Sequence, residues 1–168
     1  LAERYGRTIL LRGNIMRDPT LYEQVEKTWA AAVAPAHVAE LHPDGGFYRT
    51  LWHEVGHYLG VEATPGLEDA AGLFEEMKAD LVSLFVAPRL RESGYYDDAG
   101  LRGVYASGVR RVLQNVKPRR EQPYQTMQMI QWNWFMDRGV LTFDRASGEL
   151  AIDYSRYHDA VSALLAEV

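Results

Sequence analysis

Apolar residues recur every three or four positions along most of the chain, which is the spacing of one face of an α-helix. The clearest run is Leu73, Met77, Leu81 and Leu84. This pattern predicts six helices, with approximate bounds at residues 18–34, 47–59, 65–88, 98–116, 122–138 and 154–166. Most of the chain is therefore expected to be helical.

Two other parts of the chain have the composition of β-strands. Residues 7–12 contain the apolar and β-branched run Thr-Ile-Leu-Leu at 8–11 and are followed by Gly13, which predicts a short N-terminal strand. Residues 140–143 and 149–153 flank a turn-forming segment at 145–148, which predicts a β-hairpin. The expected fold class is mainly α (α+β): a helical domain with a short N-terminal strand and a C-terminal β-hairpin.

Length and composition narrow the classes of function. With 168 residues and 47% hydrophobic content, residues 1–168 are expected to form one domain. A net charge of −5 with dispersed basic residues argues against a nucleic-acid partner, and no apolar stretch is long enough to imply a membrane partner. The absence of cysteine excludes thiolate zinc sites, and with no visible secretory signal we expect a cytoplasmic protein. Because the first residue is Leu1, we also weigh that the domain is the C-terminal part of a longer protein.

The motif with the clearest chemistry is His53-Glu54-Val55-Gly56-His57, an H-E-x-x-H sequence within a predicted helix. Residues four apart lie one above the other on a helix, so both imidazoles can point at one ion. Zinc favours such nitrogen ligands. Glu54 lies beside the metal position and is predicted to accept a proton from a water molecule there.

A catalytic zinc ion needs a third protein ligand. The metzincin spacing would take it from position 63, which is Ala63 and cannot bind zinc. The alternative is a carboxylate on the following helix, where Glu76 and Asp80 are four apart and share a face. We therefore predict one zinc ion held by His53, His57 and Glu76. Asp80 is expected to accept the outer N–H of a ligand histidine, His53 in particular.

Either half of this pattern is weak on its own, since H-E-x-x-H arises by chance and an acidic helix face is usually solvated. Their combination, with a Pro-Gly turn between two helices, favours a zinc site. Glu54 favours a catalytic site over a structural one, because a structural zinc has no use for a base.

These residues resemble the dipeptidyl-peptidase III family of zinc peptidases. That family has a His-Glu-x-x-Gly-His zinc helix, followed by a helix with Glu-Glu-x-x-Ala-Glu/Asp. Residues 75–80 fit the second motif at each defined position, and residues 8–14 and 125–139 carry weaker similarities. The resemblance implies that Glu76 is the third ligand and that Asp80 supports a ligand histidine. The first motif here is one residue shorter, as in gluzincins such as thermolysin.

The resemblance also implies a catalytic donor and a missing partner. Where the family has a histidine near the start of the penultimate helix, this chain has Tyr124, whose phenol can donate a hydrogen bond to an oxyanion. Tyr124 is therefore expected to act with Glu54. The family's substrate cleft lies between two lobes, and the chain resembles only the zinc-bearing part, so a second lobe of the same protein is an expected partner.

The predicted function is a zinc-dependent peptidase that hydrolyses peptide bonds of oligopeptides, with Glu54 as general base. One alternative is a zinc-stabilised binding domain or a catalytically impaired peptidase homologue. Another keeps the metal chemistry but acts on a different amide or an ester.

Other conspicuous residues are expected to be structural. We interpret His37, His42 and His158 as surface residues because they lack partners at ligand spacing. A basic run is interpreted as a solvated helix end in preference to a grip on a peptide carboxylate. It consists of Arg110, Arg111, Lys117, Arg119 and Arg120. Core packing is expected for the large side chains of the penultimate helix, which are Trp132, Trp134, Met127, Met129 and Met136.

Overall fold

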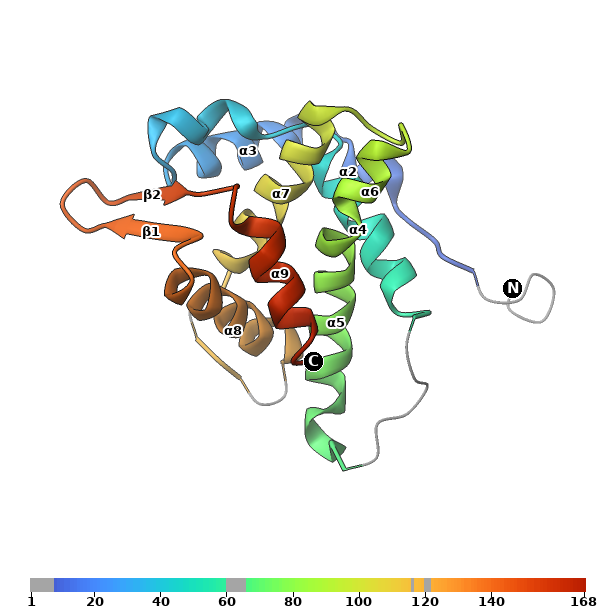
Figure 1. Cartoon of the computed structure of the whole chain (residues 1–168). Coiled ribbons are helices and arrows are strands. Elements are labelled where there is room, and N and C mark those ends of the chain that lie inside the picture. Colours follow the sequence, from blue (N-terminus) through green and yellow to red (C-terminus); the bar gives the residue numbers. More distant parts are fainter. Residues whose placement is uncertain (1–7, 60–65, 116, 120–121) are drawn as a thin grey trace.

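The computed structural model describes residues 8–59, 66–115, 117–119 and 122–168. Helices joined by loops make up most of this part of the chain, with a two-stranded antiparallel sheet near the C-terminus (Figure 1). The helices are α2 Gly13–Met16, α3 Pro19–Ala30, α4 Gly45–Gly56, α5 Ala71–Phe85, α6 Ala87–Glu92, α7 Asp98–Val112, α8 Pro123–Asp137 and α9 Tyr157–Leu165. Two 3-10 helices are η1 Pro35–Glu40 and η2 Glu68–Ala70, and the strands are β1 Leu141–Asp144 and β2 Glu149–Ile152. The predicted mainly α fold with a C-terminal hairpin is confirmed.

Local side-chain chemistry explains where two of the helices begin. Asp18 precedes α3, and its carboxylate accepts hydrogen bonds from the backbone N–H groups of Thr20 and Leu21. Pro19 occupies the first position of the helix, where its missing N–H costs nothing. Asp97 caps α7 in the same way.

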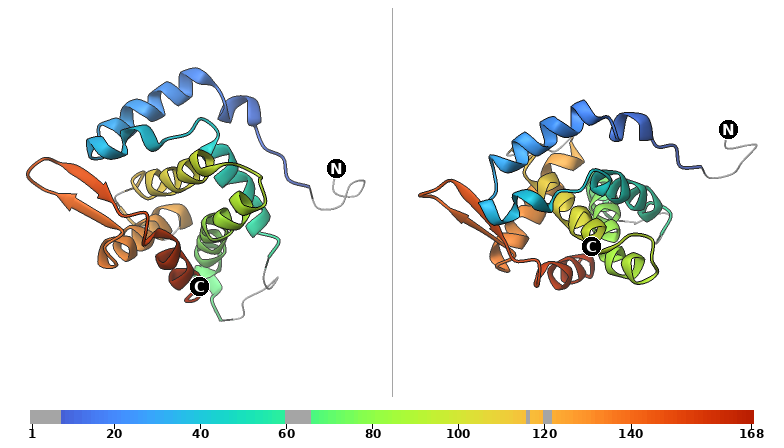
Figure 2. Two further views of the ribbon diagram at one scale, coloured as in Figure 1. Left: turned by 45° about the horizontal axis from the view of Figure 1, so that its top comes forward. Right: turned by 90° about the horizontal axis from the view of Figure 1, so that it is seen from above.

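Helix α5 lies at the centre of the helical layer, in contact with α4, α8 and α9 (Figures 1 and 2). Helix α7 packs against α4, while α2 and α3 lie along the outside of this group. The largest fully buried side chains belong to this core and include Trp29, Leu81, Leu84, Val109, Met127, Phe135 and Tyr157. None of the helices in the described ranges combines the length and apolar character needed to cross a membrane.

The hairpin extends away from the helices and is held by the segment that follows α3 (Figure 1). Leu141 pairs with Ile152 across the two strands. Leu150 donates its backbone N–H to the carbonyl of Ala32 at 3.0 Å and accepts from the N–H of Ala34 at 2.9 Å. These bonds need an extended backbone after α3, which explains why that helix ends four residues earlier than predicted.

Two sequence predictions of secondary structure are wrong. Residues 8–12 form neither strand nor helix, because a strand needs a neighbour to pair with and the described residues provide none there. The helix predicted over 65–88 is divided: α5 ends at Phe85, and α6 follows with Pro88 in its first turn, where proline is tolerated. The predicted helix end at Gly60 and most of the turn at 64–66 lie outside the described residues.

A close approach of α4 and α5 brings the two motifs together. A Cβ atom on Gly56 would lie 2.9 Å from the Cα atom of Ala79 and 3.3 Å from the Cβ atom of Val82. Only glycine therefore fits at this crossing without a shift of the backbone. The same crossing brings the last turn of α4 within reach of the side chains on α5.

Candidate metal centre

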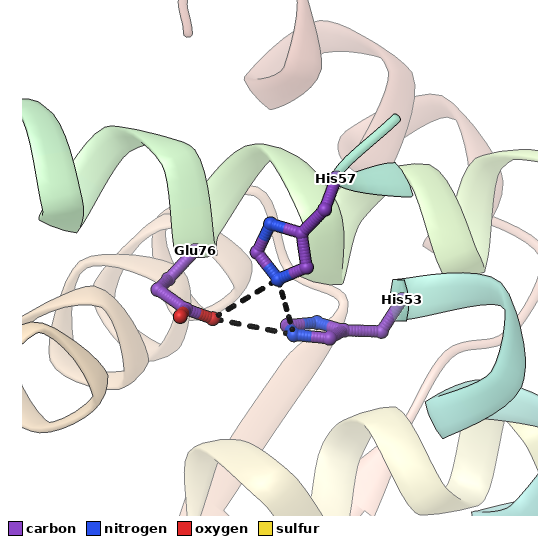
Figure 3. Close-up of side chains that lie close together, drawn as sticks. All are labelled: His53, His57 and Glu76. Carbon is purple, nitrogen blue, oxygen red and sulfur yellow. Dashed lines mark hydrogen bonds and ion pairs between the residues drawn. The ribbon is translucent and has the colours of Figure 1, made fainter. Parts of the chain in front are cut away.

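Three side-chain donors from α4 and α5 converge on one point (Figure 3). The Nε2 atoms of His53 and His57 are 3.2 Å apart. The Oε2 atom of Glu76 lies 3.2 Å from the first of them and 3.6 Å from the second. His53 is buried on the last full turn of α4, and His57 caps that helix one turn later, so the helix itself stacks the two rings.

Two carboxylates on α5 determine which ring nitrogens carry protons. The Nδ1 atom of His53 lies 2.7 Å from Oδ1 of Asp80, and Nδ1 of His57 lies 3.0 Å from Oε1 of Glu75. An ionised carboxylate only accepts hydrogen bonds, so both Nδ1 atoms are donors. The Nε2 atoms of the two rings then point toward one another and toward Glu76, where one cation can contact all three.

The spacing of the three donors fits a zinc ion. A tetrahedral ion with ligands at about 2.0–2.1 Å separates those ligands by about 3.3 Å. The three observed separations, between 3.2 and 3.6 Å, bracket that value. In addition, Oε2 of Glu76 is buried, and within the described residues no donor forms a hydrogen bond to it, which is costly for a carboxylate oxygen without a cation beside it. Two imidazoles and one carboxylate also form a donor set that zinc prefers.

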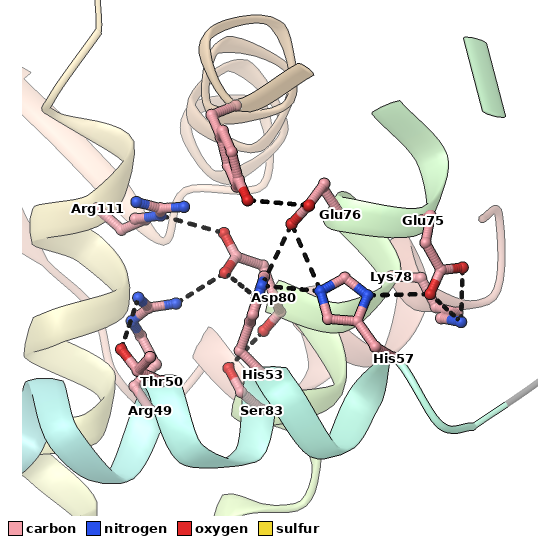
Figure 4. A network of polar contacts seen from close by, with 11 residues as sticks. Arg49, Thr50, His53, His57, Glu75, Glu76, Lys78, Asp80, Ser83 and Arg111 are labelled. Atoms are coloured by element: carbon pink, nitrogen blue, oxygen red, sulfur yellow. Dashed lines mark hydrogen bonds and ion pairs between the residues drawn. The ribbon is translucent and has the colours of Figure 1, made fainter. Parts of the chain in front are cut away.

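Asp80 is the charged centre of a network of polar contacts beside His53 (Figure 4). Its side chain is almost fully buried, with Oδ1 2.7 Å from Nη1 of Arg49 and Oδ2 3.5 Å from Nε of Arg111. Burial alone would raise the pKa of Asp80. The Arg49 charge and the hydrogen bond from His53, aided by Arg111, outweigh burial and hold that pKa far below its usual range. Asp80 is therefore ionised and orients the His53 ring.

Glu75 supports the second histidine in the same way. Lys78 Nζ lies 2.8 Å from Oε2 of Glu75 (Figure 4). The same Nζ also donates to the carbonyl of Leu59 at 2.7 Å. Burial by itself would raise the pKa of Glu75, but the hydrogen bonds from Lys78 and His57 dominate and lower it. Glu75 is thus a carboxylate that joins the His57 ring to Lys78, which in turn donates to the backbone of Leu59 just after α4.

Glu54 and Tyr124 line one cavity of about 250 Å³ beside His53. Glu54 is half-buried and follows His53 directly on α4. The Tyr124 hydroxyl, from the first turn of α8, donates to Oε1 of Glu76 at 2.9 Å. Burial and this hydrogen bond raise the pKa of Tyr124 to about 12. Its hydroxyl is therefore protonated near neutral pH and able to donate.

The structure brings together all six residues that the sequence singled out, which are His53, Glu54, His57, Glu76, Asp80 and Tyr124. Sequence reasoning missed Arg49, Arg111 and Glu75. The role of Arg49 could have been inferred from its position four residues before His53, on the same face of that helix. The role of Glu75 could have been inferred from its position next to the predicted ligand Glu76.

Two predictions about other charged residues need correction. Arg110 and Arg111 are half-buried, not solvated, although Lys117 and Arg119 are exposed as expected and Arg120 lies outside the described residues. His37 is not a surface residue either. Its side chain is 15% exposed, and its Nε2 accepts the backbone N–H of Ile152 at 3.0 Å. This histidine helps to hold the hairpin against the helices.

The other two histidines outside the site are also hydrogen-bonded. His42 accepts the backbone N–H of Asp44, and His158 lies 3.2 Å from the carbonyl of Phe85. The predicted packing role of the large side chains on α8 is confirmed for Met127, which is fully buried. Three others pack against the core: Trp132, Trp134 and Met136.

Comparisons with known proteins show that the fold has been seen before. No protein-family model matches the chain. Nudix hydrolase 3 of Arabidopsis thaliana is 24% identical over 136 aligned positions, which cover 74% of this chain and 18% of that protein. The structure of DPP III from Caldithrix abyssi matches with a TM-score of 0.74 and 18% identity, over 89% of this chain and 30% of that one.

Dipeptidyl-peptidase III from Corallococcus sp. strain EGB matches with a TM-score of 0.68 and 23% identity, over 83% of this chain and 28% of that one. Identities at this level establish a shared fold and nothing finer. The chain spans less than a third of the length of either structure and less than a fifth of the Arabidopsis protein. Its helices and C-terminal hairpin therefore have the fold of one part of these dipeptidyl-peptidase III structures.

Proposed function

We propose that this chain is the zinc-bearing domain of a peptidase that hydrolyses peptide bonds in oligopeptides. The observation that carries the proposal is the convergence of two imidazole nitrogens and one carboxylate oxygen at 3.2–3.6 Å, beside a cavity lined by Glu54 of the same helix as the imidazoles. The fold shared with two dipeptidyl-peptidase III structures supports the same activity class.

In this proposal His53, His57 and Glu76 hold one zinc ion. When bound, zinc supplies a Lewis acid that lowers the pKa of a water molecule toward about 7. Glu54 would accept a proton from a water molecule in the cavity as that water adds to the scissile carbonyl, and would return the proton to the leaving amine as the C–N bond breaks. Its place in the cavity beside His53 supports this role.

Tyr124 is proposed to donate a hydrogen bond to the carbonyl oxygen as negative charge develops on it. Support comes from its position in the same cavity and from its raised pKa of about 12, which keeps the hydroxyl protonated. In the absence of substrate the hydroxyl donates to Oε1 of Glu76 at 2.9 Å. The proposed role therefore requires Tyr124 to break this hydrogen bond and form one to the substrate.

We further propose that a second lobe of the same protein completes the cleft that binds the peptide. The similar DPP III structures are more than three times as long as their matched part. Within the described residues the cavity beside Glu54 holds only about 250 Å³, which is below the usual range for ligand sites. A peptide several residues long needs further walls.

The first test measures metal content by mass spectrometry on protein purified without chelator, beside peptide cleavage by the full natural protein. We expect one zinc per chain, cleavage of an oligopeptide mixture, loss of both on dialysis against chelator, and recovery with added zinc. Ester and non-peptide amide substrates are tested in parallel. Cleavage of one of these, without cleavage of peptides, would identify a different kind of zinc hydrolase. A chain without zinc contradicts the whole proposal.

A zinc-stabilised binding domain is the second candidate, favoured by the bond between Tyr124 and Glu76, which occupies the proposed catalytic donor. It predicts that chelator lowers the melting temperature, because an ion that binds only the folded state stabilises it. It also predicts that no peptide, amide or ester is cleaved by the zinc-loaded full protein.

Asp80→Asn is expected to lower zinc affinity about 10- to 100-fold, because the carboxylate that orients the His53 ring is lost. It also leaves Arg49 in a buried site without its anion, so the free energy of unfolding should fall by about 3 kcal/mol. Metal titration and denaturant unfolding measure the two effects. The matched control is Asp98→Asn, which makes the same change at an exposed ion pair with Arg91. If the two variants lose equal amounts of zinc affinity and of unfolding free energy, Asp80 does not support the metal site.

A further inference from the structure

A second cavity, of about 290 Å³, lies next to the metal centre between the outer helices α2 and α3 and the inner helices α4 and α7. Arg49, Thr50 and Arg111 line both this cavity and the one that contains Glu54. The two spaces are therefore neighbours that share these three side chains as part of their walls. A ligand that fills both would lie across these three side chains.

The walls of this second cavity differ in character. Leu21, Tyr22 and Val25 of α3 form an apolar side, together with residues of α2. The opposite side carries Arg110 and Arg111 of α7, along with hydroxyl groups and an amide. No acidic side chain lines the cavity among the described residues. The space thus combines an apolar surface with a positively charged one.

Arg110 makes this positive charge available to a ligand. In the part of the chain that the structure describes, its guanidinium forms no ion pair and no side-chain hydrogen bond, although the residue is half-buried. Burial lowers the pKa of Arg110, and the neighbouring charges of Arg49 and Arg111 add to this effect. Those two arginines share one anion, Asp80. Arg110 is therefore the third cation of this group, next to two arginines that already share the Asp80 carboxylate. A half-buried cation without a counter-ion is costly.

We propose that this cavity is a subsite for a carboxylate attached to an apolar residue, as found at the C-terminus of a short peptide substrate. A carboxylate would provide the anion that Arg110 lacks, through charge-assisted hydrogen bonds. The apolar side chain of the same residue would pack against Leu21, Tyr22 and Val25. The volume suits one residue and its carboxylate better than a longer segment. As a substrate assignment, this inference rests on the proposed peptidase function.

The kinetic test compares a cleavable peptide that ends in leucine with its C-terminal amide. Arg110→Gln should raise KM for the free acid about 10- to 100-fold with kcat little changed, and should affect the amide less than twofold. Arg110→Lys should recover part of the loss. Arg89→Gln, which alters an exposed arginine on α6, is the matched control and should leave KM unchanged for both the free acid and the amide. A third peptide, amidated but ending in glutamate, separates a terminal carboxylate from an acidic side chain.

The melting temperature of Arg110→Gln distinguishes a ligand-binding role of Arg110 from a structural one. Because Arg110 lies near two other cations and pairs with no described acid, Arg110→Gln should leave the melting temperature unchanged or raise it. A structural arginine would instead lower it. Loss of affinity for the free acid without loss of stability is therefore the expected signature.

A binding measurement separates failure of this inference from failure of the peptidase proposal. Calorimetry with N-acetyl-leucyl-leucine and its amide, on zinc-loaded and on metal-stripped protein, needs no turnover. We expect the wild type to prefer the acid at least about tenfold, and Arg110→Gln to lose that preference. Equal binding of acid and amide by the wild type overturns the subsite, even if the protein is an active peptidase. A clear preference in a protein without peptidase activity supports the subsite and rejects the substrate role.

Discussion

Glu54→Gln is expected to keep its zinc and to lose about 100- to 10,000-fold in kcat for peptide hydrolysis. Glutamine has nearly the same shape as glutamate but cannot accept a proton at neutral pH. Glu54 forms none of the close contacts that join His53, His57 and Glu76, so metal binding should survive the change. The substitution therefore separates proton transfer from metal binding.

The measurement is kcat and KM on the zinc-loaded variant, with metal content determined on the same sample. A melting curve shows that the fold is unchanged. KM is expected to move little, because Glu54 acts on the water and not on the peptide. If the zinc-loaded variant cleaves peptides as fast as the wild type, Glu54 is not the general base.

Glu76→Ala is expected to lower zinc affinity by more than about 100-fold, beyond the effect of removing a group that only orients a ligand. The carboxylate oxygen that lies closest to both imidazole Nε2 atoms disappears, and two nitrogens alone make an incomplete site. The variant should be purified without zinc and show no peptidase activity above background. Its melting temperature should no longer respond to chelator.

Glu75→Ala is the matched control, since it removes the same side chain one position earlier on α5. Glu75 contacts the outer nitrogen of His57, so its loss should weaken zinc binding about tenfold and leave an ion in the site at saturating zinc. Metal titration of the two variants checks this order. If Glu75→Ala loses zinc and Glu76→Ala keeps it, then Glu75 is the metal ligand and Glu76 is not.

Much of this site follows from helical periodicity alone. His53 and His57 are four residues apart, and so are Glu76 and Asp80. Each pair therefore shares one face of its own helix, whatever the rest of the chain does. The sequence also placed Gly56 between the histidines, and the structure gives its reason: α5 passes too close for any larger residue.

The sequence did not predict the surroundings of these pairs. Arg49 and Arg111 come from different helices, and only the packing of α4 and α7 places both beside Asp80. The same packing buries half of Arg110, although its sequence neighbours suggested a solvated helix end. Tyr124 was linked to the site through a family resemblance. Its distance of 2.9 Å from Glu76 depends on how α8 packs against α5.

By itself, the sequence determined the helical class of this protein, the hairpin and the two side-chain pairs of the candidate zinc site, because all of these depend on neighbours within a few positions. Only the tertiary structure decided where α3 ends, that residues 8–12 form no strand, and which arginines surround Asp80. These features depend on contacts between segments far apart in the chain. The burial of a charge and the pairing of a strand are set by whatever packs beside them, and no local pattern records that.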